Sequence, residues 1–127
     1  MQFLHPTFGP LSYADPLWSG QVRRHNRVIP FVVHGSESGP DLVLLDRLSR
    51  ILNEFLSLDA GALKLLCPQD GPFPGVKPAD LTFQSVDLLW PNKPDCFTFV
   101  FDLKGDPGAI WRVEFEDGQP KYTGRDS

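Results

Sequence analysis

A group of carboxylates in the C-terminal third of the chain contains the side chains best able to do chemistry. They are Asp102, Asp106, Glu114, Glu116, Asp117 and Asp126. Two neighbouring carboxylates can act as a general acid and a general base, but only in a cleft where their pKa values separate. Glu114 and Glu116 alternate next to a turn, which is typical of the solvated outer face of a strand. A solvated acidic face can instead attract a basic protein partner.

Other catalytic and ligand-binding patterns are incomplete. Residues 35–39, Gly-Ser-Glu-Ser-Gly, have the place of a nucleophile elbow, but Glu37 stands where the serine would be. The same loop lacks the Gly-Lys-Ser/Thr of a phosphate-binding loop. The close paired spacing of a zinc site is missing from the cysteines and histidines, which are Cys67, Cys96, His5, His25 and His34. We therefore predict no catalytic residue, no cofactor and no metal site.

Composition restricts the class of protein. The 127 residues are 41% apolar and 22% charged, which predicts a single folded domain over residues 1–127. A net charge of −4 argues against a nucleic-acid-binding protein. No apolar run approaches the roughly 20 residues of a membrane span. With neither the pattern of a signal peptide nor enough cysteines for a disulfide framework, we predict a cytoplasmic protein with two reduced, unbridged thiols.

The elements that must position these side chains are organised around residues 38–59. Leucine, isoleucine and phenylalanine recur there at helical spacing, which predicts one long amphipathic helix. Ser38 is the expected N-cap, and Pro40 suits the first turn. Asp59 is expected to cap a short second helix over residues 60–67, which Pro68 ends.

Strands are predicted on both sides of the helices. After a lead-in that docks on the core or forms a short first strand, residues 18–33 read as a hairpin about His25-Asn26. Pro30 cannot donate a ladder hydrogen bond, so its strand is expected at a sheet edge or bulged at Pro30, and an edge strand could pair with a second copy in a weak homodimer. Beyond the helices, residues 80–90 alternate with a phase shift at Ser85-Val86, and residues 96–103 alternate strictly.

The last hairpin, residues 110–124, has Asp117-Gly118 as a type I′ turn. A regular register would pair Phe115 with Pro120, Val113 with Tyr122, Trp111 with Gly124 and Glu114 with Lys121. The predicted fold is therefore α+β: an antiparallel sheet with one long and one short helix packed on one face, in the order hairpin, helix pair and about four strands.

Several short features occur in the order found in a loose group of small bacterial cytoplasmic domains of unknown function. They are Phe8-Gly9, Tyr13, residues 18–22, the leucine-rich helix from Leu42, the strands 96–103 and 110–116, and Asp117-Gly118. The chain resembles this group, some of whose members are immunity proteins of polymorphic toxin systems. It departs from the group in the long Pro/Gly-rich stretch 69–78 and in Trp111-Arg112, where such domains often have a histidine. The resemblance implies an α+β fold and a protein partner.

The predicted function is a non-catalytic protein-binding module, of the kind that neutralises a basic toxin or nuclease. The residues expected to bind the partner are Asp102, Asp106, Glu114, Glu116 and Asp117. Two alternatives stay open at this point. One is a small hydrolase that uses Asp102 and Asp106 at the open end of the sheet, and the other is a structural or oligomerising domain.

Overall fold

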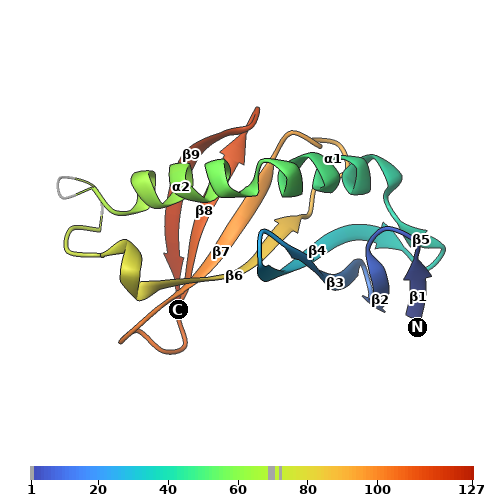
Figure 1. Ribbon diagram of the computed structural model, residues 1–127, viewed down its shortest axis with the longest axis horizontal. Coiled ribbons are helices and arrows are strands. Elements are labelled where there is room, and N and C mark those ends of the chain that lie inside the picture. Colours follow the sequence, from blue (N-terminus) through green and yellow to red (C-terminus); the bar gives the residue numbers. More distant parts are fainter. Residues whose placement is uncertain (1, 69–70, 72) are drawn as a thin grey trace.

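A nine-stranded mixed sheet and two helices form the part of the chain that the computed structural model describes, residues 2–68, 71 and 73–127. The strands are β1 (Gln2–His5), β2 (Gly9–Ala14), β3 (Leu17–Arg24), β4 (Arg27–Ser36), β5 (Gly39–Pro40), β6 (Leu81–Leu88), β7 (Phe97–Leu103), β8 (Ile110–Glu116) and β9 (Gln119–Asp126). Their order in the sheet is β1-β2-β3-β4-β6-β7-β8-β9, and β5 pairs with β4 outside this path. Helices α1 (Leu42–Asn53) and α2 (Phe55–Leu66) run end to end along the sheet (Figure 1).

The predicted antiparallel sheet of a hairpin and about four strands is wrong. The lead-in forms two strands, β1 and β2, and β4 pairs with β6 in parallel, with Phe31 opposite Val86 and Val33 opposite Leu88. The chain leaves β4, passes through both helices and returns beside β4 in the same direction, and a parallel pair needs such a long crossover. The fold stays α+β, but its sheet is larger and mixed.

The helices also differ from the prediction of one long and one short helix, because both have 12 residues. The N-cap is Asp41 rather than Ser38, and its carboxylate accepts a hydrogen bond from the Leu44 N–H at 3.0 Å. The helix is interrupted at Glu54, which separates α1 from α2. Asp59 therefore lies inside α2 and does not cap a helix. At the end of α1, a ring nitrogen of His25 donates to the Leu52 carbonyl oxygen at 2.9 Å. The tip of the β3–β4 hairpin thus supports the break between the helices.

The β3–β4 hairpin has the predicted register but not the predicted place in the sheet. His25 and Asn26 take φ angles of 55° and 61°, as a type I′ turn requires, and Val22 lies opposite Ile29. Its strand β4 is central, between β3 and β6, and not at an edge. Hydrogen-bonded and non-hydrogen-bonded pairs alternate along the hairpin, and counting from the turn makes Gln21–Pro30 a non-hydrogen-bonded pair. On the other side of β4, pairing with β6 starts only at Phe31, so Pro30 is not required to donate there either. The Pro30 strand is therefore not the edge strand at which pairing with a second copy was predicted.

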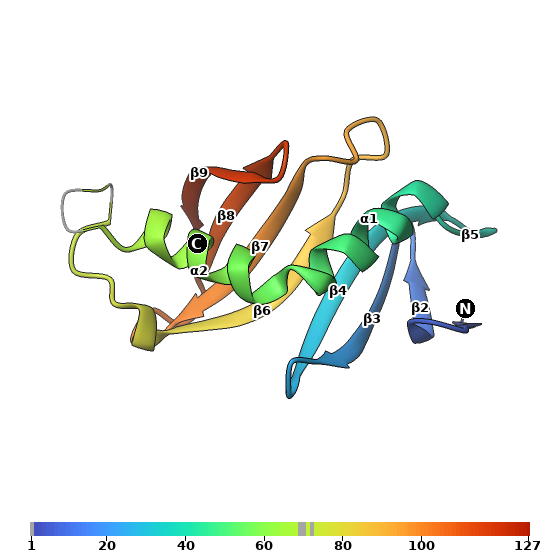
Figure 2. The same cartoon turned by 45° about the horizontal axis from the view of Figure 1, so that its top comes forward.

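The core lies between the helices and the inner face of the sheet, where α1 packs against β4 and α2 against β8 and β9 (Figure 2). All the residues predicted for it are buried there except Val22, which is half-buried against it. These predicted residues are Trp18, Val22, Ile29, Phe31, Leu45, Leu48, Ile51, Leu52, Phe55, Phe97, Phe99, Phe101, Val113 and Phe115. Among the described residues, no helix has the length and apolarity that crossing a membrane demands.

Candidate functional site

A bulge in the β8–β9 hairpin decides which side chains meet on the outer face of the sheet, the face away from the helices. The turn forms as predicted, with φ angles of 53° at Asp117 and 74° at Gly118, and Phe115 pairs with Pro120. The register then shifts by one residue at Lys121, so Glu114 lies opposite Tyr122 instead of Lys121. Directly opposed residues share a face. Tyr122 is thereby turned outward, and the prediction that it faces the core opposite Val113 is wrong.

The shifted register is stabilised by two arginines. Arg112 pairs with Gly124, where a Cβ would lie 2.5 Å from the guanidinium carbon, so a larger residue there would displace the end of the Arg112 side chain. Arg125 falls opposite Trp111, and its guanidinium carbon lies 5.9 Å from the Trp111 ring centroid. The arginine and the ring are at the distance of a cation–π contact. The regular register would have placed Gly124, which has no side chain, opposite Trp111.

The outward turn of Tyr122 completes a hollow at one end of the sheet. The hollow measures about 460 Å³ and is lined by the β6–β7 connection on one side and by β8 and β9 on the other. Its lining includes Trp90, Lys93, Cys96, Glu114, Glu116 and Tyr122. Trp90 is 41% exposed and Tyr122 is 56% exposed, whereas Trp18 and Trp111 are buried. Two aromatic rings and two carboxylates therefore share one solvent-facing hollow.

Within the described part of the chain, the two carboxylates of the hollow make long surface ion pairs. Glu114 lies 3.7 Å from Arg112, and Glu116 lies 3.9 Å from Lys121. Exposed pairs of this kind contribute about 0.2–1 kcal/mol, so an incoming cation can replace them. Arg112 would stay paired in that case, because it also bonds to Asp126. Glu114 is the carboxylate that the hollow can offer to a ligand.

The electrostatic environment of the hollow is acidic. Burial raises the pKa of the Cys96 thiol, and the carboxylate of Glu116 raises it further. Lys93 acts in the opposite direction, while Asp117 and Asp95 add to the effect of Glu116. A thiol is harder to ionise near negative charge. After burial, which is the larger cause, the part of the rise in the Cys96 pKa that comes from Glu116, Asp117 and Asp95 reflects the same negative charge that would attract a cation.

A second carboxylate stands in the row of the outer face that contains Glu114. The register places Asp87 of β6 opposite Thr98 of β7, Thr98 opposite Glu114, and Glu114 opposite Tyr122. Burial raises the pKa of Asp87, and the hydrogen bond from the Ser85 hydroxyl, at 2.7 Å, opposes that rise in part. Asp87 reinforces the acidic character of the row when it is ionised.

The structure divides the five carboxylates predicted to bind a partner into two groups. Glu114 and Glu116 line the hollow beside Trp90, and Asp117 is in the adjoining turn, where it faces a second hollow with Arg47 and Arg50 of α1. Asp102 and Asp106 line a separate hollow at the opposite ends of β7 and β8. The expected single acidic surface is therefore two surfaces, and only the first contains exposed aromatic rings.

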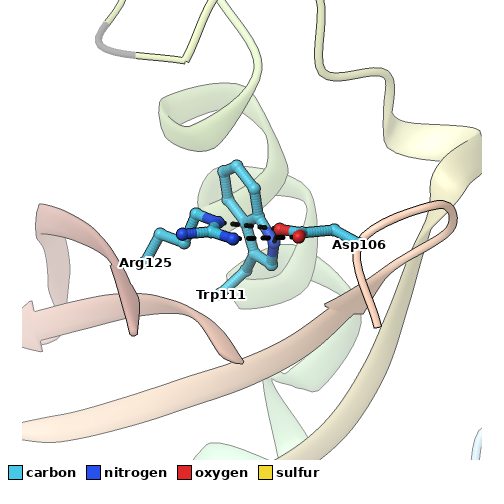
Figure 3. A network of polar contacts seen from close by, with 3 residues as sticks. All are labelled: Asp106, Trp111 and Arg125. Carbon is cyan, nitrogen blue, oxygen red and sulfur yellow. Dashed lines mark hydrogen bonds and ion pairs between the residues drawn. The ribbon is translucent and has the colours of Figure 1, made fainter. Parts of the chain in front are cut away.

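The carboxylate of Asp106 is bound by the side chains of Arg125 and Trp111 (Figure 3). Arg125 donates from Nε to Oδ2 at 2.7 Å and from a terminal nitrogen to Oδ1 at 2.9 Å, and Trp111 Nε1 donates to Oδ2 at 2.9 Å. The hydrogen bonds from Arg125 hold the pKa of Asp106 below its ordinary value. A carboxylate bound by three donors in this way is a poor general base, because its lone pairs are occupied.

We expect Asp106→Asn to lower the free energy of unfolding at pH 7 and to lose this effect in acid. A folded-state pKa below the ordinary 3.8 stabilises the protein above that pH, and the contribution disappears as the pH falls through the lowered value. Urea unfolding at pH 7 and at about pH 2 measures the difference. Arg125→Gln should reproduce the result, and adding Asp106→Asn to it should change little. A deficit in the Asp106 variant that is constant with pH would contradict the role of this ion pair.

Trp90 and Tyr122 were not among the residues that the sequence predicted to bind a partner, and the regular register had paired Tyr122 with Val113. Within the described ranges, no group of three or more His, Cys, Asp or Glu side chains could hold a metal ion. Both cysteines are free thiols, as predicted. Comparisons with family models, curated proteins and solved structures found no match. The function must therefore be inferred from the hollow itself.

Proposed function

We propose that the protein is a non-catalytic protein-binding module that binds a basic partner through the outer face of the β8–β9 hairpin. The observation that carries this proposal is the hollow in which Trp90 and Tyr122 are exposed beside Glu114 and Glu116. Protein interfaces are enriched in exposed tryptophan and tyrosine, and negative charge steers a positively charged partner to them.

The hydrolase alternative has less support. Asp102 and Asp106 line one hollow, but the carboxylate of Asp106 is engaged by Arg125 and Trp111. Acid–base catalysis by two carboxylates requires that one of them can exchange a proton near the working pH, and the pKa of Asp106 is shifted the other way. The hollow beside Trp90 therefore supports binding better than the second hollow supports hydrolysis.

The resemblance to immunity proteins favours a basic toxin or nuclease as the partner. We further propose a cytoplasmic location, which the two unbridged thiols support, because the cytoplasm keeps cysteines reduced. A weak homodimer that forms through an edge strand would use β1, β9 or the short β5, which pairs with β4 outside the main order of the sheet.

The test is charge reversal on a partner isolated from the native host and then purified. We expect the double variant Glu114→Lys, Glu116→Lys to bind that partner about tenfold or more weakly than wild type, mainly through slower association, with a smaller dependence on salt. The matched control is Glu37→Lys, Asp46→Lys, which makes the same change in net charge at exposed positions outside the hairpin. Surface plasmon resonance at several ionic strengths measures both. Equal affinity and equal salt dependence of wild type and the hairpin variant would refute the proposal.

A further inference from the structure

We infer that the hollow beside Trp90 accepts an arginine side chain of the partner, a specification that rests on the proposed function. The guanidinium would lie against the rings of Trp90 and Tyr122 and bond to Glu114. A cation is attracted to the face of an aromatic ring, and tryptophan is the strongest of the aromatic side chains in this respect. The hollow combines such rings with two carboxylates.

The charge in the hollow is not balanced by the protein itself. Arg112 is shared between Glu114 and Asp126, so one positive group stands beside two negative ones. At Cys96, the positive charge of Lys93 lowers the thiol pKa, whereas the negative charges of Glu116, Asp117 and Asp95 raise it. The lining itself contains two carboxylates, Glu114 and Glu116, and one ammonium group, Lys93, so it has a net charge of −1 that favours an added cation.

Arginine fits the arrangement better than lysine. Its planar guanidinium stacks on aromatic rings and presents two parallel N–H groups to one carboxylate, whereas an ammonium group is compact and strongly hydrated. Glu114 and Tyr122 are directly opposed on β8 and β9, so a carboxylate and a ring flank the same place. The apolar parts of Trp90, Pro91 and Phe115 in the lining can contact the methylene groups of the arginine stem.

Three blocked pentapeptides that differ only at the central residue test the inference. They contain arginine, lysine or citrulline, and citrulline keeps the shape of arginine without its charge. The readout is the indole N–H signal of Trp90 in ¹H–¹⁵N spectra of the full chain. Trp18 and Trp111 are internal controls, because their indole N–H groups donate to the Ser36 carbonyl oxygen and to Asp106.

We expect the arginine peptide to shift the Trp90 signal saturably, with a dissociation constant in the millimolar range. The lysine peptide should bind about fivefold more weakly, the scale of one exposed cation–π contact. The citrulline peptide should give no saturable shift. Tyr122→Leu and Glu114→Gln should each weaken the binding of the arginine peptide by a similar factor. Ile110→Ala changes an exposed residue elsewhere on β8 and should leave the dissociation constant unchanged.

The outcomes separate this inference from the proposed function. Absence of a saturable Trp90 shift with the arginine peptide, or equal binding of the citrulline peptide, overturns the inference, and equal binding of lysine overturns the choice of arginine. If charge reversal weakens binding to the purified partner but no peptide shifts the indole signal of Trp90, the binding function stands and the arginine site fails. If the arginine peptide binds as expected but charge reversal leaves the partner unaffected, the proposed function fails and the hollow remains an arginine site.

Discussion

Replacing Phe99 by alanine is expected to remove about 3–5 kcal/mol from the free energy of unfolding. Phe99 is fully buried in the middle of β7. Its ring lies among four others, with centroids 4.8 Å away at Phe115, 5.2 Å at Phe83, 5.5 Å at Phe55 and 5.8 Å at Phe97. The substitution leaves a cavity that these rings, which come from three strands and a helix, cannot all move to fill.

A loss of this size is a large part of the about 5–15 kcal/mol that a domain of this kind has in total. Urea unfolding followed by circular dichroism gives the free energy and its slope. The control is Val28→Ala, which removes an apolar side chain that is 43% exposed on the outer face of β4 and should cost about 0.5 kcal/mol or less. If the Phe99 variant unfolds at the same urea concentration as wild type, the aromatic cluster is not the centre of the core.

The features that the sequence predicts well are those fixed by residues close together in the chain. The His25-Asn26 and Asp117-Gly118 turns need residues that tolerate positive φ, and both turns form where these residues stand. In the same way, the alternation of Phe97, Phe99 and Phe101 correctly assigns one face of β7 to the core. Local turn chemistry and period-2 alternation therefore suffice for the hairpins and for most of the core.

The features that the sequence does not predict depend on contacts between distant segments. The apolar pattern of residues 44–56 continues through Glu54, so it gives no sign of the break that ends α1. The break is supported from outside by His25, which is 27 residues away from the Leu52 carbonyl that it caps. Parallel pairing of β4 with β6 is likewise a long-range choice, because a strand that is apolar on one face can pair in either direction.

The candidate site was predicted in part for the same reason. Glu114 and Glu116 were expected on the outer face of β8, and they lie in the lining of the hollow. Their aromatic neighbour Tyr122 was assigned to the inner face because a regular register was assumed beyond Pro120. One inserted residue reverses every later face assignment on a strand. The bulge at Lys121 therefore changes both Tyr122 and Arg125, and with them the chemistry of the site.

Phe55→Ala is expected to cost about 3–5 kcal/mol as well, although Phe55 lies on the helix side of the same cluster. Phe55 is fully buried at the start of α2. Its ring stacks on Phe99 with the centroids 5.5 Å apart, meets the edge of Phe83 at 4.9 Å, and lies 5.0 Å from the guanidinium carbon of Arg27. The residue therefore joins the helix break to the sheet and to the β3–β4 hairpin.

Because Phe55 and Phe99 are in direct contact, their two losses should not add. A double-mutant cycle measured by urea unfolding should give a coupling of about 0.5–1.5 kcal/mol, the range for aromatic pairs. Phe55→Leu is the control, since it keeps an apolar side chain in the core and should recover a large part of the loss. Strict additivity of the alanine variants, or a leucine variant as unstable as the alanine variant, would mean that α2 does not pack on β7 through this ring.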